Sequence, residues 1–191
     1  MRVTGGQFRG RALAEPPDDR VRPTSDKVRQ AMFNILAHND FGLALEGAKV
    51  IDLFAGTGAL GLEALSRGGA FVLFVDDSAD SRALIRTNVE ALNLTGATKI
   101  WRRDATDLGP LGAGAGGPFD LAFLDAPYRK GLSEKALVSL VAGGWLAPDA
   151  VAMVETAVEE SLAVPDALRV LDRRVYGETA VHILGASPGC V

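Results

Sequence analysis

The stretch from residue 48 to residue 61 constrains the fold of this chain more than any other. It reads AKVIDLFAGTGALG, a short apolar run that ends near an acid and is followed by glycines. Leu60, Leu62 and Leu65 then recur at helical spacing, so the stretch predicts a strand, a tight turn and a helix. Glycine permits positive φ and close backbone approach, and the N-terminus of a helix attracts anionic or polar groups. We therefore expect the first half of a βαβ unit, with a nucleotide-like cofactor at its turn.

The glycine spacing alone leaves the cofactor open. Gly56, Gly58 and Gly61 fit the G-x-G-x-x-G fingerprint of NAD-binding proteins, with Asp76 near the usual distance downstream. Asp52 separates the alternatives, because a carboxylate beside the turn repels a pyrophosphate but accepts hydrogen bonds from a cationic amino-acid group or from loop N–H groups. S-adenosylmethionine brings an ammonium and a sulfonium, so Asp52 favours it. A plain strand–helix turn that Asp52 merely orders is the structural alternative.

Length and composition limit the class of protein. With 191 residues the chain is long enough for one α/β domain and too short for two of usual size. No apolar run approaches the roughly 20 residues of a membrane span, and the first residues lack a signal-peptide core. The single cysteine, Cys190, excludes an internal disulfide framework and gives no metal cluster. We expect a cytoplasmic protein without a metal. A net charge of −4 argues mildly against a protein that coats nucleic acid, but it allows a local basic patch.

Acids follow the predicted strands. An apolar run at 71–75 ends in Asp76 and Asp77, a third strand at 99–101 leads to Asp104, and a fourth at 119–124 runs into Asp125. Ligands of doubly wound sheets lie at the carboxyl ends of the strands, so Asp52, Asp76 and Asp104 should converge on one crevice, where Asp76 can accept both ribose hydroxyls. The predicted cofactor site consists of Asp52, Phe54, Gly56, Gly58, Asp76, Asp77, Asp104 and Ala105.

The rest of the chain predicts a single domain with a basic extension. Further helices are expected at 26–37, 78–92 and 132–141, a fifth strand at 150–154, and a closing hairpin with strands at 169–175 and 179–184. The glycine-rich stretch 109–117 is expected to be a surface loop, and His182 a structural residue. We divide the chain into an N-terminal extension at 1–24, a domain at 25–186 and a tail at 187–191.

The N-terminal extension is basic at its start. Arg2, Arg9 and Arg11 occur among the first eleven residues without an acid, and glycines break this segment into pieces that can form a hairpin. Arg22 and Arg29 extend the basic surface if they face solvent. A frayed, solvated terminus is the alternative.

The segment Asp125-Ala126-Pro127-Tyr128 carries the chemistry. An acid, a carbonyl held by proline and an aromatic ring are suited to hold a planar amine. Hydrogen bonds to Asp125 and to the Ala126 carbonyl draw the amine of a base towards tetrahedral geometry, and Tyr128 stacks on the ring. Such positioning supplies several kcal/mol of barrier lowering without a metal or a covalent nucleophile. A strand-ending Asp-x-Pro turn with a half-buried tyrosine is the structural alternative.

These motifs together resemble the class I methyltransferases that use S-adenosylmethionine, and specifically the bacterial 16S ribosomal RNA guanine-N(2) methyltransferases (RsmD type). The motifs concerned are Gly5-Gly6 through Arg9-Gly10-Arg11, Arg22-Pro23-Thr24 with Val28-Arg29, Asp52 through Gly61, and Asp125 through Tyr128. The resemblance implies an α/β Rossmann-like fold, whose seven-stranded, mostly parallel sheet has an antiparallel last strand and is flanked by helices.

The resemblance also implies the reaction and its partners. The cofactor is S-adenosylmethionine, and the substrate is the N2 amine of a guanine in 16S rRNA, either naked or in a small-subunit particle. Asp125, Ala126, Pro127 and Tyr128 are then catalytic, and the expected RNA contacts are Arg9, Arg11, Arg22 and Arg29. Ala126 departs from the proline that the family usually has, which keeps the carbonyl acceptor but loosens φ.

Two other functions stay open at this point. An NAD(P)-dependent oxidoreductase uses the same glycine fingerprint, but it needs a catalytic acid–base pair that the sequence does not show. A non-catalytic RNA-binding assembly factor on the same fold is the second alternative, with Ala126 as a sign of lost activity. We expect a monomer without a membrane partner.

Overall fold

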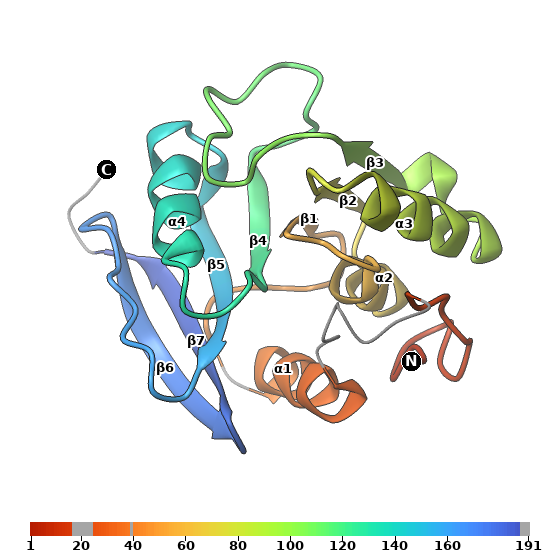
Figure 1. The fold of residues 1–191 in the computed structure, drawn as a ribbon, viewed down its shortest axis with the longest axis horizontal. Helices are drawn as coiled ribbons and strands as arrows, with labels where there is room; N and C mark the ends of the chain where they lie inside the picture. Colours follow the sequence, from red (N-terminus) through yellow and green to blue (C-terminus); the bar gives the residue numbers. More distant parts are fainter. Residues whose placement is uncertain (17–24, 39, 188–191) are drawn as a thin grey trace.

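The computed structural model describes residues 1–16, 25–38 and 40–187 (Figure 1). All of the predicted helices and strands form, and the fifth strand is longer than predicted. The elements are α1 (Asp26–His38), β1 (Lys49–Leu53), α2 (Ala59–Ser66), β2 (Phe71–Val75), α3 (Ala79–Ala91), the short 3-10 helix η1 (Thr95–Ala97), β3 (Thr98–Trp101), β4 (Phe119–Leu124), α4 (Leu132–Ala142), β5 (Leu146–Ala157), β6 (Leu168–Tyr176) and β7 (Thr179–Ala186). None of the described helices is long and apolar enough to cross a membrane.

The strands form one seven-stranded sheet in the order β3-β2-β1-β4-β5-β7-β6. Neighbours from β3 to β5 are parallel, whereas β7 is antiparallel to both β5 and β6. This arrangement confirms the predicted mostly parallel sheet with an antiparallel last strand. The strand order reverses between β1 and β4, and ligands of doubly wound sheets bind at such a switch point, outside the carboxyl ends of the strands.

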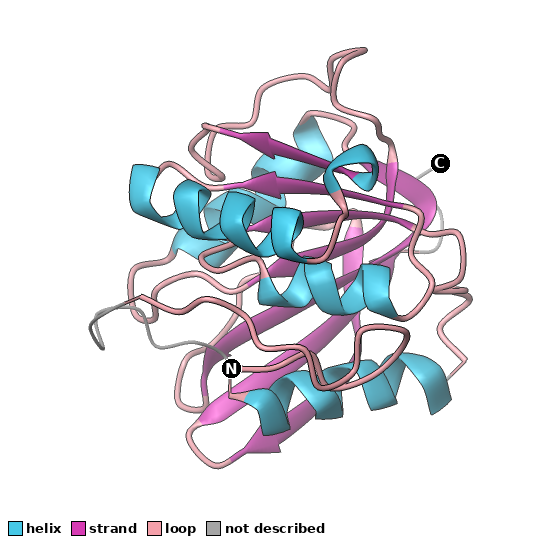
Figure 2. Cartoon of the chain, turned by 90° about the vertical axis from the view of Figure 1, so that its right-hand side faces the viewer, coloured by secondary structure: helices cyan, strands magenta, loops and turns pink. Residues whose placement is uncertain are grey.

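Helices cover both faces of the sheet (Figure 2). One core contains apolar side chains of α1, α2 and α3, among them Phe33, Leu62 and Ile85, packed on one face. The second core contains Leu137 and Leu140 of α4 and packs on the other face. Parallel strands between two helical layers are buried on both sides, which explains why most residues of β1, β2 and β4 are apolar.

The N-terminal segment packs on the domain instead of fraying. An antiparallel bridge joins Arg2 to Ala12, and Val3 and Leu13 are only 2% and 6% exposed. The backbone N–H of Gln7 donates to the carbonyl of Ser66 at 2.8 Å, so the hairpin rests on the end of α2. The predicted domain boundary after residue 24 borders residues outside the described part of the chain, and it stays a prediction.

A buried carboxylate joins this segment to two helices. Glu63 of α2 is completely buried, and its Oε2 accepts hydrogen bonds from the backbone N–H of Thr4 at 2.8 Å and from Nε of Arg29 at 3.4 Å. Its Oε1 accepts from Oγ1 of Thr4 and from Nε of Arg67, both at 2.8 Å. The network therefore ties together the N-terminal segment, α1 and α2.

The expectation that Arg29 extends a basic surface is wrong. Its side chain is 0% exposed, and besides Glu63 it contacts Asp26, where Nη2 lies 2.7 Å from Oδ1. Its Nη1 has no hydrogen-bond partner among the described residues. The helical spacing places Arg29 off the apolar stripe of α1. Arg29 is nevertheless buried, because it pairs with the buried carboxylate of Glu63. An RNA phosphate does not reach it there.

Replacing Glu63 by alanine should destabilise the protein by about 3–5 kcal/mol, because it leaves the buried guanidinium of Arg29 without its buried counter-charge. Urea denaturation measures the free energy of unfolding. Glu90→Ala, an exposed glutamate on α3, is the control and should stay within about 0.5 kcal/mol of the wild type. Equal stability of the two variants would contradict a stabilising role for the network.

Candidate functional site

Four acids lie on one face of the sheet, near the carboxyl ends of its central strands. In the strand register Asp52 of β1 aligns with Phe74 of β2 and Phe123 of β4, and Phe123 aligns with Met153 of β5. Side chains two residues apart along a strand point to the same face. Each of the three partners is followed two positions later by an acid: Asp76, Asp125 and Glu155.

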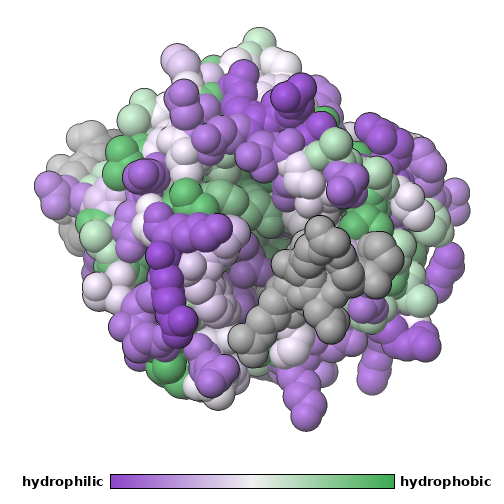
Figure 3. Space-filling view, viewed as in Figure 1, coloured by the Kyte–Doolittle hydropathy of each residue, from purple (hydrophilic) through white to green (hydrophobic). Residues whose placement is uncertain are grey.

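The acids are close enough to interact. The negative charges of Asp125 and Asp76 both raise the pKa of Asp52, in addition to the larger effect of its burial. The predicted convergence of Asp52 with Asp76 is therefore present, and Asp125 joins them. Figure 3 shows that the face drawn in Figure 1 is hollowed near its centre, where apolar residues are surrounded by hydrophilic ones.

The loop between β1 and α2 has an unusual backbone. Gly56 and Gly58 have φ values of 57° and 78°, as expected, but Phe54 also lies in the left-handed region at 56°. This conformation costs a non-glycine residue about 1–2 kcal/mol, and such strain is concentrated at functional sites. A Cβ on Gly61 would lie 2.5 Å from the ring of Phe74, so the third glycine lets α2 pack closely on β2.

Asp52 orders the start of α2. Its side chain is 1% exposed, and its Oδ2 accepts a hydrogen bond from the backbone N–H of Gly61 at 2.9 Å. The residue before the helix, Gly58, supplies no side-chain cap, so Asp52 satisfies a first-turn N–H instead. Burial, only partly offset by this bond, raises its pKa well above the ordinary value. A loop N–H was one of its two predicted partners, and contact with a cofactor stays a prediction.

Asp76 joins the end of β2 to the same loop. Its Oδ2 accepts from the backbone N–H of Gly56 and its Oδ1 from that of Ser78, both at 2.9 Å. Burial and the charge of the exposed Asp77 raise its pKa, while the two hydrogen bonds lower it. Each carboxylate oxygen has a second lone pair, so the half-buried Asp76 retains acceptors for ribose hydroxyls.

Asp104 lies further out. It is exposed, and its Oδ1 accepts from the backbone N–H and the hydroxyl of Thr106 at 2.8 and 2.7 Å, which lowers its pKa. The next residue, Ala105, is buried. A cofactor role for either residue stays a prediction.

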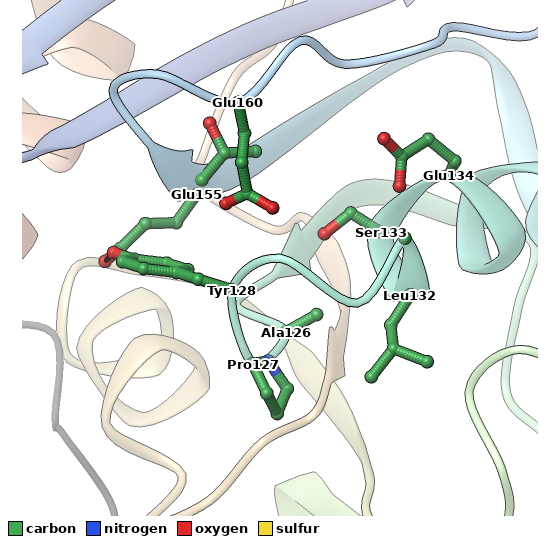
Figure 4. A pocket seen from close by; sticks show the side chains of 10 residues that line it. Ala126, Pro127, Tyr128, Leu132, Ser133, Glu134, Glu155 and Glu160 are labelled. Carbon is green, nitrogen blue, oxygen red and sulfur yellow. Dashed lines mark hydrogen bonds between the residues drawn. The ribbon is translucent and has the colours of Figure 1, made fainter.

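The loop after β4 carries the predicted chemical motif. Asp125 is half-buried, Ala126 is 4% exposed and Pro127 is exposed. Tyr128 is half-buried, and its ring extends from the loop towards Glu155 (Figure 4). Burial and the hydrogen bond to Glu155 raise the pKa of its phenol. A small pocket beside the loop is lined by Ala126, Pro127, Tyr128, Gly131, Leu132, Ser133, Glu134, Glu155, Thr156 and Glu160.

Sequence reasoning missed Glu155. The predicted fifth strand ended at Val154, directly before this acid, whereas β5 runs on to Ala157. An acid directly after a predicted strand is the same signal that identified Asp76 and Asp125, and it was available here.

Asn88 of α3 is, after Glu155, the second site residue that the sequence did not reveal. It links the basic N-terminal hairpin to the glycine loop. Asn88 is 1% exposed, and its Nδ2 donates to the carbonyls of Thr57 at 3.0 Å and Ala14 at 3.2 Å. Its Oδ1 accepts from the backbone N–H of Ala14 at 2.7 Å. Arg9 and Arg11 are exposed on the hairpin that leads to Ala14. Arg22 lies outside the described residues.

Comparisons with known proteins agree with this fold. The family described as "Conserved hypothetical protein 95" matches residues 1–185. "Ribosomal RNA small subunit methyltransferase D" of Escherichia coli K12 is 38% identical over 185 residues, which covers 96% of this chain and 88% of the relative. Its namesake in Haemophilus influenzae is 30% identical over 179 residues, 93% and 89% of the two chains. The solved "Putative methyltransferase yhhF" of Escherichia coli superposes with a TM-score of 0.82 at 32% identity, over 98% of both chains.

Asp52→Asn should stabilise the folded protein at neutral pH. The amide keeps an acceptor for Gly61 but removes a desolvated charge beside two other acids. Because the folded-state pKa is raised, the contribution of Asp52 to stability falls as the pH rises from about 4 through that pKa. We expect a gain of roughly 0.5–2 kcal/mol at pH 7, a typical size for replacing a destabilising functional residue.

Urea denaturation between pH 4 and pH 8 measures this gain and the flatter pH dependence that accompanies it. The exposed Asp107, changed to Asn, is the control. A less stable Asp52→Asn variant at pH 7 would show that the charge itself is needed for folding.

Proposed function

The chain belongs to the family described as "Conserved hypothetical protein 95", and on this premise we propose that it transfers a methyl group from S-adenosylmethionine to the N2 amine of a guanine in 16S ribosomal RNA. The observation that carries the proposal is the Asp125-to-Tyr128 loop, which follows β4 beside the glycine loop that follows β1. The Escherichia coli and Haemophilus influenzae relatives, both named as methyltransferases of small-subunit ribosomal RNA, support the substrate class.

The residues around the glycine loop suit a cationic cofactor. S-adenosylmethionine supplies an electrophilic methyl group on a positively charged sulfur. Asp52, Asp76 and Asp125 make the crevice negative, which attracts the sulfonium and ammonium groups and disfavours the pyrophosphate of NAD(P). Burial is the main cause of the raised pKa of Asp52, and a bound cation offsets the smaller part that comes from repulsion by Asp125 and Asp76. Asp76 accepts the ribose hydroxyls, and the backbone of the strained Phe54-to-Gly58 loop lines the same site.

The loop after β4 holds the acceptor. The target guanine is unpaired or flipped out of a helix, because a paired base does not present its amine for in-line attack. Asp125 and the Ala126 carbonyl accept hydrogen bonds from the amine, and Tyr128 stacks on the base. As the new C–N bond forms and the C–S bond breaks, the sulfur keeps the electron pair and positive charge develops on the nitrogen, where the carboxylate of Asp125 stabilises it. The nitrogen then loses one proton to solvent and becomes the neutral N2-methyl amine.

We expect Asp125→Ala to lower kcat about 100-fold or more, the size typical of a lost electrostatic contact in a transition state. The affinity for S-adenosylmethionine should stay near that of the wild type. Asp107→Asn is again the control.

The assay incubates each protein with labelled S-adenosylmethionine and unmethylated small subunits, followed by mass spectrometry of the nucleosides. The wild type should yield N2-methylguanosine, and its absence would overturn the proposed function. Near-wild-type turnover by Asp125→Ala would overturn the mechanism alone.

Replacing both Arg9 and Arg11 by glutamine should weaken RNA binding. Each lost phosphate contact reduces the slope of log K against log salt concentration by about one, so the double variant should lose about two. Cofactor affinity should not change.

The control is a double variant of β6, at the far edge of the sheet, in which Arg169 and Arg174 are both changed to glutamine. It removes the same charge and should leave the slope of log K against log salt concentration unaltered. Titrations of RNA at several salt concentrations give the slopes. Equal slopes in the wild type and the Arg9/Arg11 variant would exclude the hairpin as the RNA contact.

A further inference from the structure

Glu155 is a buried acid for which the mechanism above has no use. Its side chain is 5% exposed, at the carboxyl end of β5. Because Leu124 pairs with Val154 in the register, Glu155 is level with Asp125 and beside the loop that holds the proposed acceptor. Burying a carboxylate is costly unless it is hydrogen-bonded, so its partners are informative.

One of these partners is the hydroxyl of Tyr128. It donates to Oε1 of Glu155 at 2.5 Å, within the range of strong hydrogen bonds between a hydroxyl and a carboxylate. The same hydroxyl lies 3.2 Å from Oγ1 of Thr179 on β7. The Tyr128 side chain is therefore held at both ends. Its Cα belongs to the loop after β4, and its hydroxyl contacts Glu155 of β5 (Figure 4) and Thr179 of β7.

The backbone of this loop is held to the same side of the sheet. The N–H of Arg129 donates to Oε1 of Glu160, whose Oε2 accepts from the N–H of Ala157 at 2.9 Å. Arg129 has a φ of 61°, a left-handed conformation that the surrounding contacts must maintain. The backbone directly after Tyr128 is held in this way, and the hydrogen bond to Glu155 restricts rotation of the Tyr128 side chain.

We propose that Glu155 is a positioning residue for the target base: by accepting the hydrogen bond of Tyr128 it holds the ring in the orientation on which the guanine stacks beside Asp125. The inference rests on the proposed function and adds a residue to it. It also changes the expected role of Tyr128. If stacking alone mattered, phenylalanine would serve equally well, whereas a ring held by its hydroxyl loses its orientation in Tyr128→Phe.

A double-mutant cycle separates this role from a purely structural one. Tyr128→Phe and Glu155→Ala should each lower the single-turnover methylation rate about tenfold, the size of one lost hydrogen bond to a charged group. The double variant should be no slower than the slower single variant, because both changes break the same bond. Glu155→Gln keeps an acceptor and should recover part of the rate. Tyr176→Phe, at the only other tyrosine, is the matched control.

Cofactor affinity should stay constant throughout the cycle, whereas a general loss of structure would lower it. Independent, additive losses, near 100-fold in the double variant, would overturn the role of Glu155, as would a wild-type rate in Tyr128→Phe.

A readout without turnover tests the bond itself. In a spectrophotometric titration Tyr128, assigned by comparison with Tyr128→Phe, should ionise above the ordinary tyrosine range, and Glu155→Gln should lower its pKa. No effect of Glu155→Gln on this pKa would overturn the proposal. A wild type that makes no N2-methylguanosine overturns the proposed function and the positioning role with it. An active wild type with additive losses overturns the role of Glu155 alone.

Discussion

The buried charge of Glu63 is the constraint on which the arrangement of the N-terminal segment, α1, α2 and the glycine loop depends. A carboxylate without access to water requires several donors, and here they come from Thr4, Arg29 and Arg67, in three different segments. A buried ion pair of this kind contributes little net stability relative to an apolar core, but the loss of one partner is costly, so the arrangement is specific. Because α2 carries Glu63 and begins at the glycine loop, the position of that loop is set by the same network.

The candidate site is acidic, whereas the N-terminal hairpin carries exposed arginines. The central strand ends bring together Asp52, Asp76 and Asp125, whose potential suits a cationic cofactor and an amine that becomes positive during the reaction. The same potential repels phosphates. In the proposed function, the exposed arginines of the N-terminal hairpin bind the polyanion, and only an extruded base enters the acidic crevice. A chain with a net charge of −4 can in this way combine an acidic site with RNA binding.

The parts of the fold that follow from local patterns could be predicted from the sequence. Apolar runs with an acid at or directly after their end predicted β1, β2 and β4. The glycine spacing predicted the turn at the switch point. Contacts between distant segments could not be predicted. Arg29 is polar and off the apolar stripe of α1, and only its partner Glu63, 34 residues later, explains its burial. Asn88 and the bond from Tyr128 to Glu155 likewise depend on which strands and loops become neighbours.

The contacts of the N-terminal hairpin limit when this segment can fold during synthesis. Thr4 binds Glu63, Phe8 binds Ser66 and Ala14 binds Asn88, across sequence separations of 59, 58 and 74 residues. At synthesis rates of about 5–20 residues per second, the last of these partners follows Ala14 by roughly 4–15 s. This segment therefore cannot reach its final place before α3 has been synthesised. Asn88 also donates to the carbonyl of Thr57, so the hairpin and the glycine loop share a partner that is made after both.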